Sequence, residues 1–86
     1  MPYALSVMGG DCIGLGIESL GNSEECKKAA ASLGKRFEEI ENNFAWQKNC
    51  YFFARDDEVY WNNHHTGAKN SLGQEICKEN GKCFVR

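Results

Sequence analysis

The sequence predicts an α+β fold: a small domain held together by disulfide bonds, in which one main helix over about residues 23–33 packs on an antiparallel sheet. Three observations predict it. The chain of 86 residues is too short to bury a large core, so it needs an additional constraint. Five cysteines are spread along the chain. One helical pattern is followed by a pair of aromatic strands, with a hairpin at about residues 50–62. The length predicts a single domain over residues 1–86.

The first part of the chain is expected to be extended. Residues 3–8 form a short apolar stretch that predicts a first strand or an ordered arm. This stretch ends at Gly9-Gly10, a pair with the backbone freedom of a turn. Between residues 12 and 20, apolar side chains alternate with glycines, which is typical of a strand with one buried face. The alternating residues are Ile13, Leu15 and Ile17.

The clearest helical signal begins at Asn22. Asn22 or Ser23 can accept a hydrogen bond from the first free backbone amides, and acidic residues follow in the first turn. Asn22 and Glu25 have the spacing of a capping box, and Gly34 stands where a helix commonly ends. One narrow face of this helix is made of small side chains. Its members are Cys26, Ala29, Ala30 and Leu33.

The segment of residues 35–49 is ambiguous. Its apolar residues have helical spacing, but Asn42-Asn43 interrupts them, so a short second helix or an ordered loop would both fit. Those apolar residues are Phe37, Ile40 and Phe44.

An aromatic hairpin follows. Residues 50–54 and 58–62 are aromatic and β-branched runs joined by Arg55-Asp56-Asp57. With a two-residue turn at Asp56-Asp57, Phe52 would lie opposite Trp61 and Ala54 opposite Val59.

Alternation along the hairpin divides its side chains between two faces. Cys50, Phe52 and Trp61 share one face, which we expect to lie under the helix. Because Cys26 is on the packing face of that helix, we expect a Cys26–Cys50 disulfide bond. The opposite face is aromatic and is our candidate interaction face: Tyr51, Phe53 and Tyr60. Either residues 37–46 cover these side chains or a partner does, since large exposed aromatic patches are uncommon on monomers.

The order of short motifs along the chain resembles a family. The motifs are Cys12, Ile17-Glu18-Ser19, Glu25-Cys26, Ala29-Ala30, Leu33-Gly34, Cys50-Tyr51, Val59-Tyr60-Trp61-Asn62 and Ile76-Cys77-Lys78. This succession resembles an uncharacterised cysteine-rich module found in predicted proteins of marine algae, particularly dinoflagellates. The resemblance covers residues 12–78 and leaves residues 1–11 and 79–86 as terminal arms. In this sequence Asn49 replaces the module's usual glycine before the third cysteine, and Cys83 lies beyond the pattern.

The resemblance implies a fold and a compartment, but it supplies no catalytic residues. Together with the faces of the helix and hairpin, the four matching cysteines favour Cys26–Cys50 with Cys12–Cys77. Cys83 would then be a free thiol or pair with another chain. Cysteines spread along a short chain are typical of an oxidising compartment, which is either outside the cell or an organelle lumen.

Metal and catalytic patterns are weaker. No C-x-x-C pair is present, so the sequence disfavours a zinc site built on Cys77, Cys83 and the His64-His65 pair. Nothing in the sequence indicates an activated thiol at Cys83. Adjacent histidines in a polar loop, and acidic residues beside turns, are usually solvated. The acidic candidates are Glu38-Glu39, Glu41 and Asp56-Asp57.

Charge and hydropathy limit the partners. Twelve acidic and ten basic residues give a net charge of −2 without a basic stripe, so we expect no nucleic-acid partner. No apolar run is long enough for direct membrane insertion. The first residues lack the basic and apolar regions of a signal peptide, so we expect a targeting segment outside this numbering.

Two function classes follow. The first is a non-catalytic protein-interaction module or accessory subunit of a larger assembly, with no cofactor or metal. The distribution of the similar family makes the lumenal side of an algal photosynthetic membrane complex one compatible location. The alternative is a secreted carbohydrate-binding domain. In that alternative Trp46 or Tyr60 stacks on a sugar, and Asn62 and Asn63 bind its hydroxyl groups.

Overall fold

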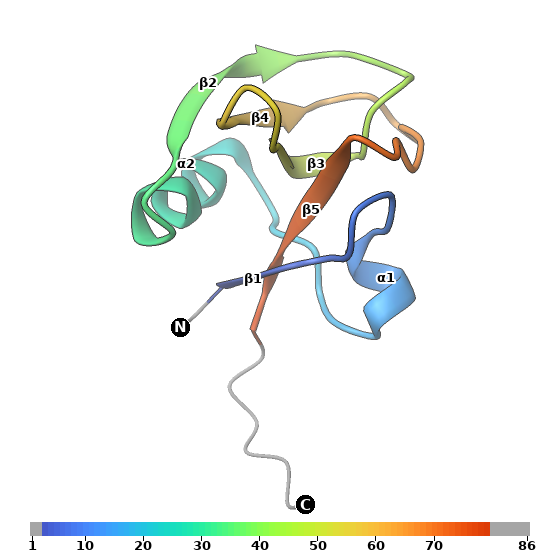
Figure 1. The fold of residues 1–86 in the computed structure, drawn as a ribbon, viewed down its shortest axis with the longest axis horizontal. Coiled ribbons are helices and arrows are strands. Elements are labelled where there is room, and N and C mark those ends of the chain that lie inside the picture. The colour runs from blue at the N-terminus through green and yellow to red at the C-terminus, as the bar shows by residue number, and fades with distance from the viewer. Residues whose placement is uncertain (1–2, 80–86) are drawn as a thin grey trace, which may run out of the picture.

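The structure is built on a mixed β-sheet (Figure 1). It is a computed structural model that describes residues 3–79, in which the sheet has five strands in the order β1-β5-β3-β4-β2. The strands are β1 (Tyr3–Leu5), β2 (Arg36–Glu41), β3 (Asn49–Phe53), β4 (Glu58–Asn62) and β5 (Gly73–Lys78). The helices are α1 (Cys12–Leu15) and α2 (Ser23–Ser32). Neighbouring strands are antiparallel except β2 and β4, which run parallel, so the expectation of a wholly antiparallel sheet is wrong.

The helix α2 has the ends that the sequence predicts. Asn22 is its N-cap, and the side-chain oxygen of Asn22 accepts a hydrogen bond from the Glu25 amide at 2.8 Å. Gly34 follows the last turn in a left-handed conformation with φ 72°. The Lys35 amide then bonds back to the Ala30 carbonyl at 2.8 Å, which satisfies a terminal carbonyl of the helix.

The core of the described residues lies between α2 and the sheet. The small face of α2 is buried there and lets the helix backbone lie close to the strands. Its buried residues are Cys26, Ala29 and Ala30. The sheet supplies Cys50, Phe52, Val59, Trp61 and Ile76, and Leu20 completes the cluster.

The hairpin keeps its expected faces although its register differs. The connection spans residues 54–57, and Phe52 lies opposite Val59 instead of Trp61. The expected and the observed partner of Phe52 are thus two residues apart on β4. Side chains two residues apart point to the same side of a sheet. The division into a helix-facing set and an aromatic set is therefore unchanged.

The segment expected to be a strand over residues 12–20 instead forms α1. Asp11 caps this short helix, because its Oδ1 accepts a hydrogen bond from the Gly14 amide at 2.8 Å. Gly16 ends it with φ 75°. Cys12 points inward and Ile13 outward, so the apolar alternation does not mark one buried face.

The segment after Gly34 forms an edge strand, β2, and neither a helix nor a loop as expected. It pairs with β4, and an irregularity between Phe37 and Glu39 shifts the register. Phe37 lies opposite Val59, and Ile40 lies opposite Trp61. Because of this irregularity, Phe37 and Ile40 lie on the same side of β2 although they are three residues apart. This explains why their spacing resembles that of a helix.

Disulfide bonds tie each helix to the sheet. Cys26–Cys50 joins α2 to β3 with a Cα–Cα distance of 5.4 Å, and Cys12–Cys77 joins α1 to β5 at 5.6 Å. Both bonds are consistent with an oxidising environment. Cys83 lies outside the described residues.

Candidate functional site

The aromatic face of the hairpin is covered by Trp46. The Trp46 ring stacks on Tyr51 at a centroid distance of 5.2 Å and also contacts Phe53 at 4.7 Å. Tyr51 stacks in turn on Tyr60 at 5.4 Å. Tyr51 is 2% exposed and Phe53 9%, while Tyr60 is half-buried. Tyr51 and Phe53 are therefore not available as contact residues on this surface, and the candidate interaction face is corrected accordingly.

The phenol groups of this face are used inside the molecule. The Tyr51 hydroxyl donates to Glu41, and the Tyr60 hydroxyl donates to Glu58 at 2.6 Å. Burial and then the Glu41 hydrogen bond raise the pKa of Tyr51. The Glu58 hydrogen bond and then burial raise the pKa of Tyr60. Both phenols remain protonated donors, so the aromatic face is a second core.

The Asn62 side chain has a structural role, so it does not supply the sugar contact expected of it. Its side chain is fully buried. Its oxygen accepts from the Asn43 and His64 amides, and its nitrogen donates to carbonyls of Asn43, Trp46 and Gln47. No donor or acceptor of this amide is left for a sugar hydroxyl, and Trp46 is engaged with the hairpin.

The histidine pair also has a local role. His64 Nδ1 accepts hydrogen bonds from the amides of Thr66 at 3.2 Å and Gly67 at 2.9 Å, which closes the turn after β4. Within residues 3–79, no group of three or more His, Cys, Asp or Glu side chains is placed to hold a metal ion. The His64 ring therefore has a structural role in the loop after β4.

Two of the acidic candidates, Glu38 and Asp56, make surface ion pairs. Arg36 binds Glu38 at 2.6 Å and Glu58 at 2.7 Å, and Arg55 binds Asp56 at 3.4 Å. These contacts are solvent-exposed and of the kind that contributes little to stability.

A cleft of about 350 Å³ lies between α1 with β5 and the segments of residues 47–49 and 66–69. One wall comes from α1 and β5 with Asp11, Ile13 and Glu75, and the other from the segments that carry Lys48 and Lys69. A cleft of this volume fits a small molecule.

Backbone contacts hold the second wall in place. The Ala68 amide donates to the Trp46 carbonyl at 2.8 Å. Gly67 has φ 60°, and a Cβ there would lie 2.7 Å from the Lys48 nitrogen. Only glycine fits this close approach, so residues 66–69 lie directly on residues 46–48.

Asn49 lies at the floor of the same cleft in an unusual conformation. Its φ of 71° is in the left-handed region, which glycine adopts most readily and asparagine tolerates. Asparagine is therefore compatible with this position, and it adds an amide side chain to the lining of the cleft.

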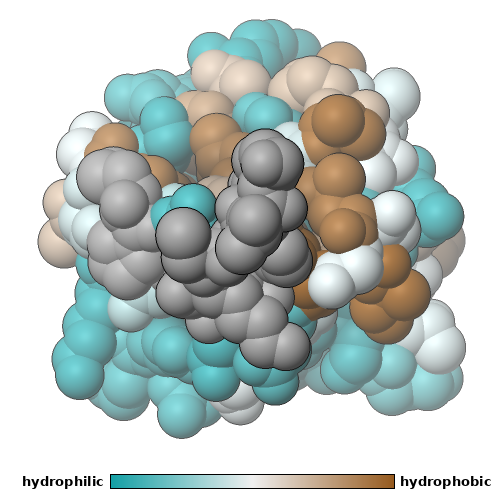
Figure 2. Space-filling view, turned by 90° about the horizontal axis from the view of Figure 1, so that it is seen from below, coloured by the Kyte–Doolittle hydropathy of each residue, from teal (hydrophilic) through white to brown (hydrophobic). Residues whose placement is uncertain are grey.

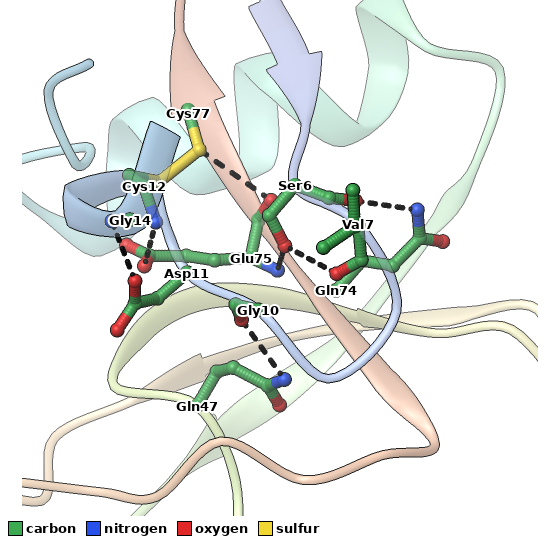
Figure 3. Close-up of a disulfide and its surroundings, with 10 residues drawn as sticks. All are labelled: Ser6, Val7, Gly10, Asp11, Cys12, Gly14, Gln47, Gln74, Glu75 and Cys77. Atoms are coloured by element: carbon green, nitrogen blue, oxygen red, sulfur yellow. Dashed lines mark hydrogen bonds between the residues drawn. A yellow bond between two sulfur atoms is a disulfide. The ribbon is translucent and has the colours of Figure 1, made fainter. Parts of the chain in front are cut away.

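Glu75 is the unusual residue of the cleft. Its side chain reaches from β5 toward the backbone of Cys12, beside Asp11 (Figure 3). Oε1 accepts a hydrogen bond from the Cys12 amide at 2.9 Å, and Oε2 is also buried. Burial raises the pKa of Glu75, and the charge of Asp11 acts in the same direction. Hydrogen bonds from the Cys12 amide and from the side chains of Ser19 and Asn49 partly oppose that shift.

Sequence reasoning did not identify Glu75. Its only signal in the sequence is an acidic residue directly before the apolar pair Ile76-Cys77. Its hydrogen bond with the Cys12 amide joins two residues that are distant in the sequence, so no local pattern could reveal it.

Exposed apolar side chains gather near α1. Ile13 is 82% exposed and Leu15 47%, and both stand on this helix. Figure 2, which views the molecule from below, shows brown apolar residues on the side where α1 lies in Figure 1. A second exposed pair is Met8 and Leu72, whose loops are joined by the hydrogen bond from the Gly9 amide to the Gly73 carbonyl at 2.9 Å.

Comparison with family models, curated proteins and solved structures gives no match. None of the helices in residues 3–79 is both long and apolar enough to cross a bilayer. The functional argument therefore depends on the geometry of this chain.

Proposed function

We propose that this chain is a non-catalytic protein-interaction module, or an accessory subunit of a larger assembly, that docks through the apolar surface of α1. The observation that carries the proposal is the exposure of Ile13 and Leu15 on a helix that is linked to the sheet by a disulfide bond. Large apolar side chains that are held outward together are typical of contact surfaces.

The way in which α1 is held supports its role in presenting Ile13 and Leu15 to a partner. A helix of four residues is too short to be stable alone, so its geometry depends on the Asp11 cap and the Cys12–Cys77 bond. Gly14 and Gly16 stand beside the apolar residues and add no side chains that would shield them. A partner would therefore meet Ile13 and Leu15 in a preformed arrangement, which lowers the entropic cost of binding.

The proposed compartment is an oxidising one, because disulfide bonds hold both helices. The resemblance to the algal module makes the lumen of a photosynthetic membrane system our specific proposal.

The test compares two surface variants of the tagged protein. In the first, Ile13 and Leu15 are replaced by Ser. In the control, Phe44→Ser removes an aromatic side chain that is 74% exposed and stands elsewhere, between β2 and β3. Chains that co-purify from a native algal extract are identified, and the strongest is then titrated as a purified protein against each variant.

We expect the Ile13/Leu15 variant to bind that purified partner at least about tenfold more weakly, while Phe44→Ser binds as the wild type does. Equal binding by the wild type and the Ile13/Leu15 variant, with both correctly folded by circular dichroism, would refute the proposed docking surface.

A further inference from the structure

The chain leaves β5 beside α1. Ser19 and Cys77 form an antiparallel bridge, and the Lys78 amide donates to the Glu18 carbonyl at 2.9 Å. Because the two segments run in opposite directions, the chain after Lys78 is directed back along the residues that precede Glu18, toward α1. The residues that follow β5 therefore start next to the docking surface proposed above.

The segment of residues 80–86, which lies outside the described residues, is long enough to reach that surface. The Cα atoms of Cys12 and Cys77 are 5.6 Å apart, and consecutive Cα atoms are about 3.8 Å apart. The Cα atom of Ile13 therefore lies within about 10 Å of that of Cys77. An extended chain from Cys77 to Phe84 spans up to about 23–25 Å, so Phe84 can reach Ile13.

The same segment carries an apolar run, Cys83-Phe84-Val85. Asn80-Gly81 stands before it and has the backbone freedom of a turn, so the run can fold onto α1 instead of continuing past it. Ile13 is 82% exposed and Leu15 47%, so both have apolar area left to bury. Removing apolar area from water favours contact between the run and these two side chains.

Charges beside the two surfaces are complementary. Lys82 and Arg86 flank the apolar run, whereas Asp11 stands before α1 and Glu18 shortly after it. The basic ends of the segment are therefore attracted to the acidic ends of this surface. A second copy of the surface would instead bring like charges together, which disfavours a symmetric dimer here.

We propose that Cys83-Phe84-Val85 cover Ile13 and Leu15 in the free protein, and that a partner must displace this run in order to dock. This regulation rests on the docking surface proposed above. The tether keeps the run at a high effective concentration beside α1. A partner therefore binds only the fraction of molecules in which the run has detached, and its apparent affinity is reduced by that fraction.

The first test is nuclear magnetic resonance on the disulfide-bonded, methyl-labelled protein. We expect nuclear Overhauser effects between the Phe84 ring and the methyl groups of Ile13 and Leu15. Phe84→Ser should shift these methyl signals, whereas Phe44→Ser, which removes an exposed ring between β2 and β3, should leave them in place. The proposal is overturned if the wild type lacks these effects. It is also overturned if the signals move with protein concentration, as contact with a second copy would cause.

Partner binding is the second test. The purified partner is titrated against the wild type, Phe84→Ser and Phe44→Ser. We expect Phe84→Ser to bind at least about threefold more tightly than the wild type, because its docking surface is no longer covered. Phe44→Ser should bind as the wild type does. Equal or weaker binding by Phe84→Ser overturns the proposed regulation.

The docking surface and its cover fail separately in these tests. If the Phe84 contacts are observed but the Ile13/Leu15 variant binds the partner as tightly as the wild type, the docking surface is refuted and the contact of the run with α1 stands. If that variant loses partner binding while Phe84 does not contact α1, the docking surface stands and the cover is refuted.

Discussion

Removing the Cys26–Cys50 bond should destabilise the fold severely. The bond closes a loop with a sequence separation of 24 residues. On the chain-entropy model, the loss of this constraint costs about 3.5 kcal/mol. A chain of this length is expected to have a total stability of about 4–13 kcal/mol, so the loss leaves a marginal fold. Both cysteines are fully buried in the core between α2 and the sheet, and replacing them by Ala leaves small voids that add to the cost.

The measurement is equilibrium unfolding in urea, followed by tryptophan fluorescence. Trp61 is a suitable reporter, because it lies opposite Cys50 on β4 and belongs to the same core. The reference variant replaces Cys12 and Cys77 by Ala, which opens a loop with a separation of 65 residues and should cost about 4.4 kcal/mol. If the Cys26→Ala/Cys50→Ala variant loses less than about 1 kcal/mol, the loop-closure reasoning fails.

Two further predictions concern buried polar groups. Because the folded state raises the pKa of Glu75, it binds that proton more tightly than the unfolded state does, and the resulting stability is lost as pH rises from the unfolded to the folded pKa. The free energy of unfolding of the wild type relative to Glu75→Gln should therefore fall as pH rises above the ordinary glutamate pKa of about 4.3 in urea titrations; a constant difference would contradict the raised pKa. Asn62→Ala removes the buried amide that binds the backbone of four other residues, and it should cost about 3–5 kcal/mol. A thermal melt unchanged from that of the wild type would show that water replaces the amide.

The helix α2 and the faces of the hairpin could be predicted because local signals agree there. The Asn22 cap, the small packing face and Gly34 all indicate the same helix, and each depends only on residues within a few positions. The predicted hairpin register differs from the observed one, but the shift along β4 is two residues, an even number. Cys50 therefore remained on the face that Cys26 covers.

The strand expected over residues 12–20 shows where pattern reasoning fails. A helix of one turn offers too few residues for a helical period to appear, and glycine disfavours both helix and strand. Asp11 and Gly16 decide the outcome as caps. The alternation of Ile13 with Leu15 predicts a buried face, but both side chains are exposed.

The edge strand β2 was missed for a different reason. A strand is recognised by a period of two, and the irregularity between Phe37 and Glu39 breaks that period. Its partner β4 is separated from it by β3 in the sequence, so the parallel pairing is a tertiary contact without a local signal.

The proposed docking surface depends on one disulfide bond. Cys12–Cys77 fixes α1 on β5, and this fixes the outward position of Ile13. Cys26–Cys50 does not touch this surface, since it joins α2 to β3 in the main core. Opening the first bond should therefore abolish partner binding even in molecules that remain folded, because α1 is too short to keep its geometry alone. Opening the second bond should reduce partner binding only in proportion to the unfolded fraction. Titrations of the two double-Ala variants at equal folded fraction distinguish these cases, and equal affinities in the two would show that α1 keeps its position without its bond to β5.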